Sequence, residues 1–302
     1  MAQPNQQLTA FLDQYEGEYT GKQRSAILNG LELTERLEKY AQQSLGLMPH
    51  LAETKRNTII WSPPGAGKTF TVRQVARAAN LDYVPFHGKA SLNALVMKMA
   101  KMCYTRQGQT IALWIDDCDS FFQGTDELNF MKIMLDGDEP EISWDVNVST
   151  QISTAKRLGD NILADALEFY NNGGVGIRIP MDNVRTTITT NKQLASKQDI
   201  FKKKINIHEH AVRDRCNWRA FNINSDEAWG WMASIMLSDN VFAGIQSPFT
   251  LTMAQTWLLV KTFQTYWDEL NANSMRTVME AGAMLYNNPR SFADEFEQNF
   301  LK

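Results

Sequence analysis

A chain of 302 residues, 43% of them hydrophobic, can bury a large core and exceeds the usual size of a single domain. Its formal net charge of −4 argues against a protein that coats nucleic acid with its whole surface, although it is compatible with a local basic channel. No apolar run is long enough to span a membrane, and the first residues lack the features of a secretory signal. The three cysteines are far apart without metal-ligand spacing, so we expect a reduced, cytoplasmic protein.

Residues 1–24 are polar and show little periodicity, so we expect a flexible arm or a segment that docks a partner. Apolar residues at helical spacing then predict an amphipathic helix over residues 25–44. Residues 57–61 form a short β-rich run, and after the next loop apolar residues recur at helical spacing over residues 72–79. This order of strand, tight loop and helix is the context that a phosphate-binding loop requires.

The loop itself reads Ser-Pro-Pro-Gly-Ala-Gly-Lys-Thr over residues 62–69, with Ser62 where the motif usually has its first glycine. Its glycines let the backbone N–H groups point inward, and the helix N-terminus adds a partial positive charge. Lys68 would reach the β- and γ-phosphates, and the Thr69 hydroxyl would ligate Mg²⁺. A glycine-rich turn with a surface lysine is the alternative. The predicted nucleotide-binding residues are Pro64, Gly65, Ala66, Gly67, Lys68, Thr69 and Phe70.

Strands and helices continue to alternate after the loop. Residues 82–86 predict a second strand, and residues 92–102 predict a second helix. Residues 111–115 are an unbroken apolar run, typical of a strand in a parallel sheet that is covered on both faces. This run ends in Asp116, which we expect to hold Mg²⁺ directly or through water. Asp117 is the candidate catalytic base or water-positioning residue.

An insertion over residues 136–183 comes next. It contains a predicted helix at residues 155–170 and a predicted hairpin near residues 173–176. The insertion could contact a substrate or only decorate the surface. A strongly β-prone run then covers residues 184–190 and ends before Asn191.

The pattern changes after residues 218–223, the last strand candidate. Helices are predicted over residues 226–237, 252–270, 275–286 and 292–301, and the first two begin with capping boxes. The predicted fold class is therefore α/β. It consists of a nucleotide-binding domain with a parallel sheet flanked by helices, residues 25–223, followed by a small all-α lid domain, residues 224–302.

Two of these motifs resemble those of one family. Residues 62–69 are similar to the Walker A motif of AAA+ ATPases, including its Pro-Pro, and residues 115–121 are similar to their Walker B motif. The family's usual Walker B pair is Asp-Glu, whereas this chain has Asp116-Asp117. The compact segment between the motifs resembles clamp loaders and helicase loaders. The many Asn, Gln, Met and Trp residues are similar to those of viral, phage-type replication proteins.

Three more segments extend the resemblance toward the C-terminus. Residues 189–191 resemble sensor 1, in which a polar side chain helps to place the lytic water. Arg215 resembles the arginine finger of clamp-loader-like members, with Arg213 as the second choice, and Arg276 resembles sensor 2. Both arginine assignments compete with ordinary solvated surface arginines. The resemblance thus implies four catalytic residues, which are Asp117, Asn191, Arg215 and Arg276.

The resemblance implies ATP and Mg²⁺ as cofactors and hydrolysis at the subunit interfaces of a homo-oligomeric ring, a hexamer or pentamer. An arginine supplied by the neighbouring subunit would stabilise charge on the γ-phosphate, and hydrolysis would move the lid against the core. Because Asp117 is one methylene shorter than glutamate, we expect slow hydrolysis without a partner.

Three functions are compatible with such an ATPase. The first is a helicase loader or other DNA replication factor, with Lys89, Lys98, Lys101 and residues 202–204 lining a phosphate-binding channel. These lysines could equally be a solvated surface. The second is a protein-remodelling chaperone, and the third is a structural switch that binds ATP but scarcely hydrolyses it. No membrane partner is expected, and a viral protein of this kind would act in the host cytoplasm.

Overall fold

The computed structural model describes residues 4–48, 57–87, 91–136, 141–196, 207–238, 249–270 and 274–301. The chain divides into two compact units. The first consists of Met1–Lys39, Pro63–Lys68 and Phe221–Lys302, and the second of Tyr40–Ser62 and Thr69–Ala220.

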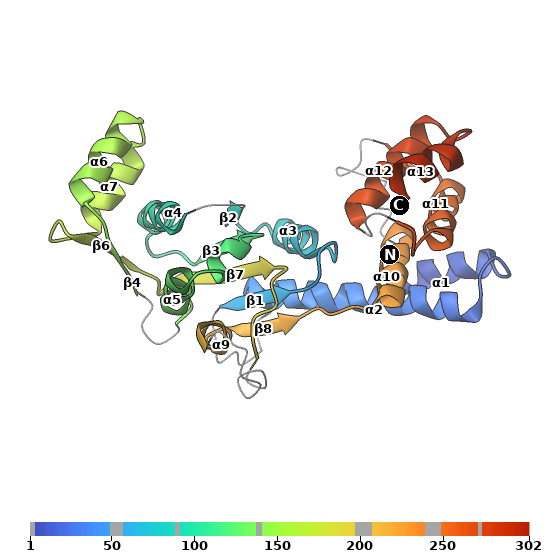
Figure 1. Cartoon of the computed structure of the whole chain (residues 1–302), viewed down its shortest axis with the longest axis horizontal. Coiled ribbons are helices and arrows are strands. Elements are labelled where there is room, and N and C mark those ends of the chain that lie inside the picture. The colour runs from blue at the N-terminus through green and yellow to red at the C-terminus, as the bar shows by residue number, and fades with distance from the viewer. Residues whose placement is uncertain are drawn as a thin grey trace. The chain divides into compact units, whose positions relative to one another are not determined.

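A five-stranded parallel sheet is the centre of the second unit (Figure 1). Its strands lie in the order β2-β3-β7-β1-β8, and all neighbours are parallel. They are β1 (Thr58–Trp61), β2 (Tyr83–His87), β3 (Ile111–Asp116), β7 (Val184–Thr190) and β8 (Asn217–Ala220). The predicted α/β core with a parallel sheet is confirmed.

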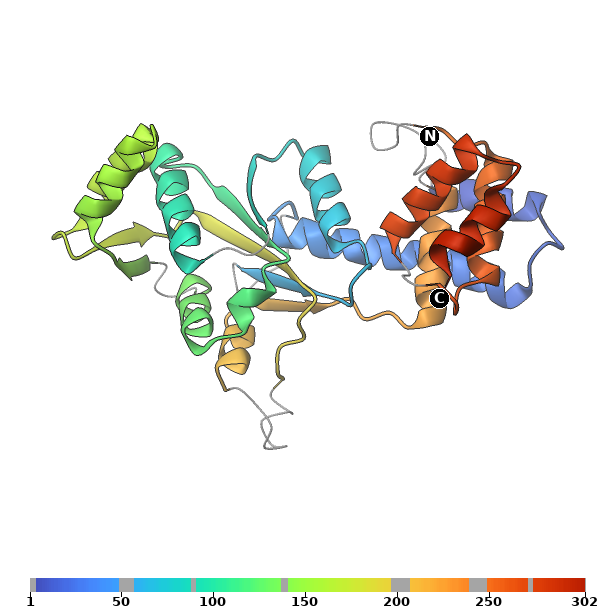
Figure 2. The same ribbon diagram turned by 45° about the horizontal axis from the view of Figure 1, so that its top comes forward.

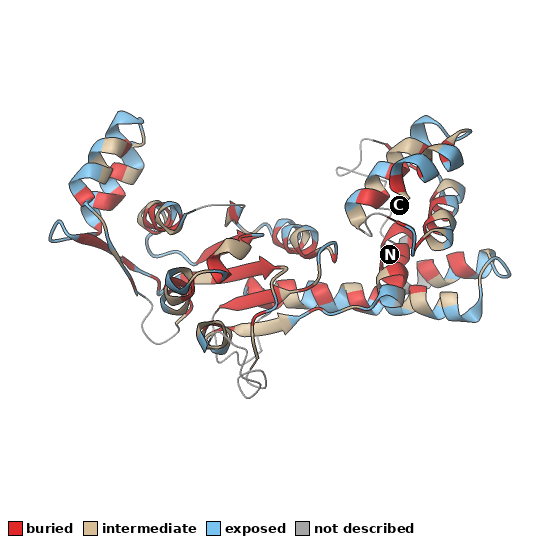
Figure 3. Cartoon of the chain, in the orientation of Figure 1, coloured by how far each residue is buried: buried red, intermediate tan, exposed pale blue. Residues whose placement is uncertain are grey.

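The strands follow from the hydrophobic pattern. All six residues of β3 are buried, as expected for a central strand covered on both faces, whereas the edge strand β8 is half-buried (Figure 3). In the register, Asp116 lies opposite Thr189, His87 lies opposite Asp116, and Trp61 lies opposite Thr190. Four strands therefore end close together at one edge of the sheet, because parallel strands share the direction of their carboxyl ends.

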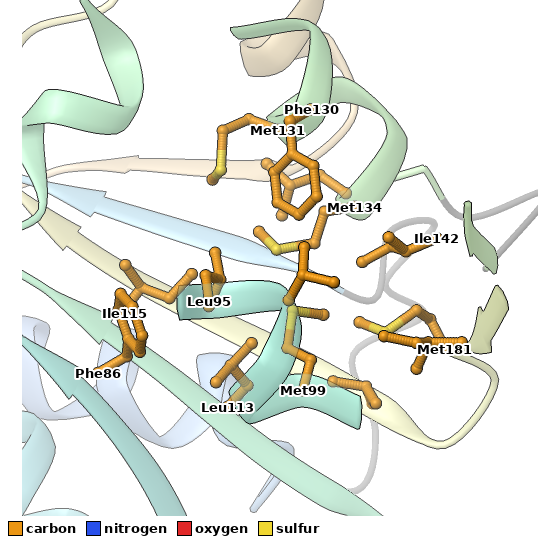
Figure 4. Close-up of a cluster of buried hydrophobic side chains, with 14 of the residues drawn as sticks. Phe86, Leu95, Met99, Leu113, Ile115, Phe130, Met131, Met134, Ile142 and Met181 are labelled. Carbon is orange, nitrogen blue, oxygen red and sulfur yellow. The ribbon is translucent and has the colours of Figure 1, made fainter. Parts of the chain in front are cut away.

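Helices flank this sheet. They are α3 (Lys68–Ala78), α4 (Leu92–Thr105), α5 (Thr125–Met134) and α9 (Ile207–Asp214), with a short 3₁₀ helix, η1 (Asp119–Phe122). Buried side chains of β2, β3, α4 and α5 pack together, joined by Ile142 and Met181 from the segment that follows α5 (Figure 4). As its sequence indicates, α4 begins with Ser91 as N-cap, whose hydroxyl accepts from the Ala94 N–H.

The insertion forms a small antiparallel sheet and a helical hairpin. The sheet has the order β4-β6-β5, and helix α7 packs on both α6 and α4 (Figure 2). The predicted hairpin near residues 173–176 is confirmed by the pairing of β5 with β6. These elements are β4 (Glu141–Asp145), α6 (Val148–Arg157), α7 (Asn161–Phe169), β5 (Asn171–Asn172) and β6 (Gly176–Pro180).

The prediction of a single helix over residues 155–170 is wrong. Gly159 adopts a left-handed conformation with φ of +76°, which ends α6, and the Asp160 side chain then caps α7 by accepting from the Leu163 N–H. Asp160 also forms an ion pair of 2.7 Å with Lys101 of α4, so the turn between the two helices is attached to the core.

The first unit is helical, which confirms the predicted all-α C-terminal region. Both predicted capping boxes are present, at Asn224 with Glu227 and at Thr252 with Gln255. None of the described helices is long and apolar enough to cross a membrane. The helices are α1 (Pro4–Gln14), α2 (Gly21–Ser44, of which residues 21–39 belong here), α10 (Ser225–Ser238), α11 (Met253–Thr265), α12 (Met275–Asn287) and α13 (Phe292–Phe300).

The expected flexible arm at residues 1–24 is also corrected by the structure. Residues 4–14 are helical, and Leu8, Phe11 and Leu12, spaced as one face of a helix, are buried. This spacing was present in the sequence but was masked by the polar residues around it.

Helix α1 packs on α10, and an aromatic cluster formed by Phe11 and the residues that follow α1 contacts α11. The rings of Phe11, Tyr15 and Tyr19 lie 5.4–5.8 Å from Trp257. Glu18 accepts hydrogen bonds from Lys261 Nζ at 2.8 Å and from the Trp257 indole at 2.9 Å. These two donors lower the pKa of Glu18. The N-terminal segment is thus part of the helical unit.

Helices α2 and α10 cross at a pair of glycines. A Cβ atom on Gly230 would lie 2.2 Å from the Ala26 carbonyl oxygen, and one on Gly30 would lie 2.3 Å from the Gly230 carbonyl oxygen. Both contacts are with backbone atoms, which cannot rotate away as a flexible side chain can. The two helices can approach this closely only because neither glycine has a side chain.

We expect Gly230→Ala to destabilise the protein by about 1–3 kcal/mol, because the added methyl group forces the two backbones apart. Urea unfolding followed by circular dichroism measures this loss. Gly21→Ala is the matched control, since a Cβ there meets no atom within 4 Å and alanine favours the helix. A Gly230→Ala variant as stable as the wild type would contradict the close crossing.

Candidate nucleotide site

The loop over Pro63–Lys68 follows β1 and leads into α3. Gly65 and Gly67 have φ of +82° and +71°, in the left-handed region that favours glycine, so the backbone of the loop requires glycine at both positions. Lys68 is 4% exposed, and its ammonium group donates to the Pro63 carbonyl oxygen at 3.3 Å. The lysine is therefore held within its own loop.

Within the first unit, this loop forms one wall of a pocket of about 160 Å³. Gly67 lies directly against Trp231, since a Cβ on Gly67 would be 2.8 Å from the indole ring. Trp231 is 2% exposed, and its indole N–H has no hydrogen-bond partner among the described residues. The pocket is lined by residues 63–66 and by Ile223, Asn224, Ser225, Ala228, Trp231, Met232 and Trp267.

In the second unit, three side chains contact the Asp116 carboxylate. The Thr69 hydroxyl donates to Asp116 Oδ1 at 2.8 Å, and the Thr189 hydroxyl donates to the same oxygen. On the other side, His87 Nδ1 lies 3.3 Å from Asp116 Oδ2. The Asp116 side chain is 5% exposed, so these contacts compensate much of the cost of burying a carboxylate.

The pair of Thr69 and Asp116 has the chemistry of a magnesium site. Mg²⁺ takes hard oxygen ligands, and proteins usually supply one or two carboxylates while substrate phosphates and water complete the shell. A hydroxyl and a carboxylate oxygen 2.8 Å apart fit this description. Thr69 and Asp116 would hold the ion, which would neutralise charge on the β- and γ-phosphates.

Asp117 and Asn191, two of the residues that the resemblance implied, also lie together. The Asn191 side-chain amide donates to Asp117 Oδ1 at 3.1 Å. Asp117 has φ of +52°, a conformation that aspartate tolerates better than most residues, and its backbone N–H donates to the Thr189 carbonyl oxygen at 3.2 Å. This turn directs the carboxylate away from the strand and toward Asn191.

The two predicted arginines lie in different units. Arg215 precedes β8, at the amino ends of the strands, whereas Asp116 and Asn191 lie at their carboxyl ends. Its Nε donates to Asp136 Oδ2 at 3.0 Å, and its Nη1 donates to the Ala211 carbonyl oxygen at 3.1 Å. Arg276 is an exposed residue in the first turn of α12 in the helical unit. Within the second unit, Arg215 is not grouped with the carboxylates.

Sequence reasoning missed the contacts of His87 and Thr189 with the Asp116 carboxylate. Thr189 also accepts a hydrogen bond of 3.1 Å from the Trp114 indole, which fixes its hydroxyl toward Asp116. The available signal was the register, since both residues come at or near the carboxyl end of a strand next to β3. A polar residue at that position of a neighbouring parallel strand is a candidate by geometry alone.

The basic residues considered for a channel are only partly described. Lys98 donates to the Pro85 carbonyl oxygen, and its ammonium lies 5.5 Å from the centre of the Phe86 ring. Lys101 is paired with Asp160. Partial burial lowers the pKa of Lys98. Lys89 and residues 202–204 lie outside the described residues.

Residues 58–164 match the model of one protein family, the "ATPase family associated with various cellular activities (AAA)". Over this stretch the chain is similar to AAA ATPases. The match contains Lys68, Thr69, Asp116 and Asp117, and it ends before Asn191 and the arginines. It supports an AAA-type P-loop ATPase domain, and it does not distinguish clamp-loader-like members or a viral source.

A search of the curated proteins found no match. Among solved structures, the chain is similar to that of C. elegans PCH-2, with 10% sequence identity and a TM-score of 0.39. The alignment covers 88% of this chain and 64% of the PCH-2 chain, so this chain spans less than two thirds of that protein's length.

Proposed function

We propose that this protein binds ATP with Mg²⁺ and hydrolyses it as an AAA-type motor. The observation that carries the proposal is the hydrogen bond between Thr69, the residue after the loop lysine, and Asp116 at the end of a central strand. A phosphate loop needs an adjacent hydroxyl and a strand-end carboxylate to hold its metal ion, and these two groups are 2.8 Å apart.

The pocket beside the loop supports a purine base as the other part of the ligand. Its walls include the planar side chains of Trp231 and Trp267 and the adaptable side chain of Met232. Because a buried indole N–H without a partner is costly, a ring nitrogen of the base that accepts from Trp231 would remove this cost. We therefore propose that the base of ATP occupies this pocket.

Hydrolysis requires a group that orients water toward the γ-phosphate. We propose that Asp117 does this and that Asn191 fixes its carboxylate through the hydrogen bond of 3.1 Å. The shorter side chain of aspartate leaves a less favourable distance to the water than glutamate would, so basal turnover is slow. The contact between Asp117 and Asn191 favours hydrolysis over a switch that only binds ATP.

We propose that Arg215 acts on the nucleotide of a neighbouring copy in a homo-oligomeric ring. β8 has four residues, so its ends are roughly 10 Å apart at about 3.3 Å per residue. Arg215 at the amino end therefore cannot reach the carboxyl ends of its own sheet. Its guanidinium side chain is 38% exposed and available to a second copy. Arg276 would contact the phosphates from the lid when ATP is bound.

For the macromolecule that is moved, we propose DNA, as in a helicase loader or replication factor. Support comes from the resemblance of the compact segment between the two motifs to DNA-handling relatives. Lys98 and Lys101 make contacts within the chain, so these two of the lysines expected to line a channel do not support the proposal. A protein substrate is the competing outcome.

Asp117→Asn should lower kcat for ATP by about 100-fold or more, because the amide cannot accept a proton, while nucleotide affinity is retained. Steady-state phosphate release and binding of a fluorescent ATP analogue measure the two quantities. Lys68→Ala is the comparison variant and should lose nucleotide binding. Normal turnover by Asp117→Asn would exclude the proposed role.

Mixing two inactive variants tests the role of Arg215. Arg215→Ala retains its own nucleotide site and should lose about 10³-fold in kcat, whereas Lys68→Ala cannot bind nucleotide but retains its arginine. Mixed rings should regain activity, because Lys68→Ala subunits supply Arg215 to nucleotide on their neighbours. A mixture of Lys68→Ala with Asp117→Asn, whose defects lie in the same site, should stay inactive. Mixed assemblies of Arg215→Ala and Lys68→Ala without activity would argue against action across an interface.

A DNA-associated motor should hydrolyse ATP faster when DNA is added. We expect single- or double-stranded DNA to stimulate steady-state hydrolysis, with a steep decrease as salt rises from 50 to 200 mM, because counterions compete for the phosphates. Stimulation by a protein partner and none by DNA would instead identify a remodelling chaperone.

A further inference from the structure

Trp61 connects the strand before the phosphate loop to Asn191. It is the last residue of β1, and its indole Nε1 donates to the Asn191 carbonyl oxygen at 3.1 Å. The strands β1 and β7 are neighbours, with Trp61 opposite Thr190, so the indole reaches the first residue after β7. Asn191 is thus held at its backbone by Trp61, while its side chain holds Asp117.

A three-layer stack supports this indole. The Trp61 and Trp218 rings have their centres 6.4 Å apart and are inclined by only 16°. The Arg213 guanidinium lies 4.7 Å from the centre of the Trp218 ring. Arg213 also donates from Nη1 to the Leu194 carbonyl oxygen at 3.3 Å. The segment from Asn191 to Leu194 is therefore attached at both ends to the outer members of one stack.

This arrangement gives a structural role to Arg213, the second candidate for the arginine finger. Arg213 lies in α9, and its guanidinium is occupied by Trp218 and by the Leu194 carbonyl group. Arg215, two residues later, makes separate contacts with Asp136 and Ala211. The two arginines therefore have different partners, and the Arg213 side chain contacts the segment after β7.

We propose that Trp61 is a positioning residue for Asn191 and that the stack of Arg213, Trp218 and Trp61 sets the rate of hydrolysis. This inference rests on the proposed ATPase function. Asn191 is the first residue after β7, and the Trp61 indole constrains the position of its backbone carbonyl group. This constraint matters because Asp117 is a short carboxylate that tolerates little displacement of its partner.

The three stacked side chains are only partly buried, and Trp218 also packs against the buried cluster around α4, α5 and β3. Two members of the stack, Trp218 on the edge strand β8 and Arg213 on α9, lie on the elements next to Arg215. A copy that engages Arg215 would therefore meet elements attached to the Asn191 segment.

Trp61→Phe tests the contact, because phenylalanine keeps a ring on Trp218 and removes only the donor to Asn191. We expect kcat for ATP to fall about tenfold with an unchanged KM and unchanged nucleotide affinity. Trp144→Phe is the matched control. It removes another indole hydrogen bond of the same unit, to Asn93 Oδ1 at 3.3 Å, and should leave kcat unchanged. A Trp61→Phe enzyme with the wild-type kcat would overturn the proposal.

A double-mutant cycle separates positioning from a structural effect. If Trp61 acts through the Asn191 side chain, Trp61→Phe should cause no further loss of kcat in an Asn191→Ala background. An equal tenfold loss in both backgrounds would overturn the proposal, because the effect would then be independent of Asn191. Failure of the ATPase function itself would be recognised separately, since the wild type would then turn over no faster than Lys68→Ala.

Discussion

The site depends on one buried carboxylate at the end of a central strand. Asp116 can be buried only because neighbouring side chains supply hydrogen bonds, and the parallel register determines which side chains can do so. His87 and Thr189 come from the strands on either side of β3, and Thr69 comes from the helix after the phosphate loop. The order and register of the strands therefore determine the chemistry at this edge.

A second constraint fixes the direction of the neighbouring carboxylate. The left-handed turn at Asp117 directs its side chain away from the strand axis, where Oδ1 accepts a hydrogen bond from the Asn191 side-chain amide. Backbone conformations of this kind are costly and persist where surrounding contacts enforce them. Here the Thr189 carbonyl group holds the Asp117 N–H, and the Trp61 indole holds the Asn191 backbone. The positions of both residues therefore depend on the fold through the same few hydrogen bonds.

The sequence predicted what depends on local pattern. Unbroken apolar runs located β3, and the β-prone run over residues 184–190 coincides with β7. Sequence-based prediction failed where a few residues decide the local structure and differ in type from the residues around them. Leu8, Phe11 and Leu12 make a helix within a polar stretch, and Gly159 divides a run that otherwise reads as one helix. The contact of His87 with Asp116 could not be predicted, because it depends on strand order, which is a property of the whole sheet.

The packing of the N-terminal segment on α11 has a consequence for how the chain folds during synthesis. Glu18 and Trp257 are 239 residues apart in sequence, and their contact cannot form until α11 has left the ribosome. The sheet unit, whose segments lie between residues 40 and 220, is complete much earlier. Until then the aromatic side chains at the end of α1 and after it lack Trp257 as their partner. Nascent chains are therefore most exposed to aggregation late in translation, and premature termination before residue 257 would leave these side chains without that partner.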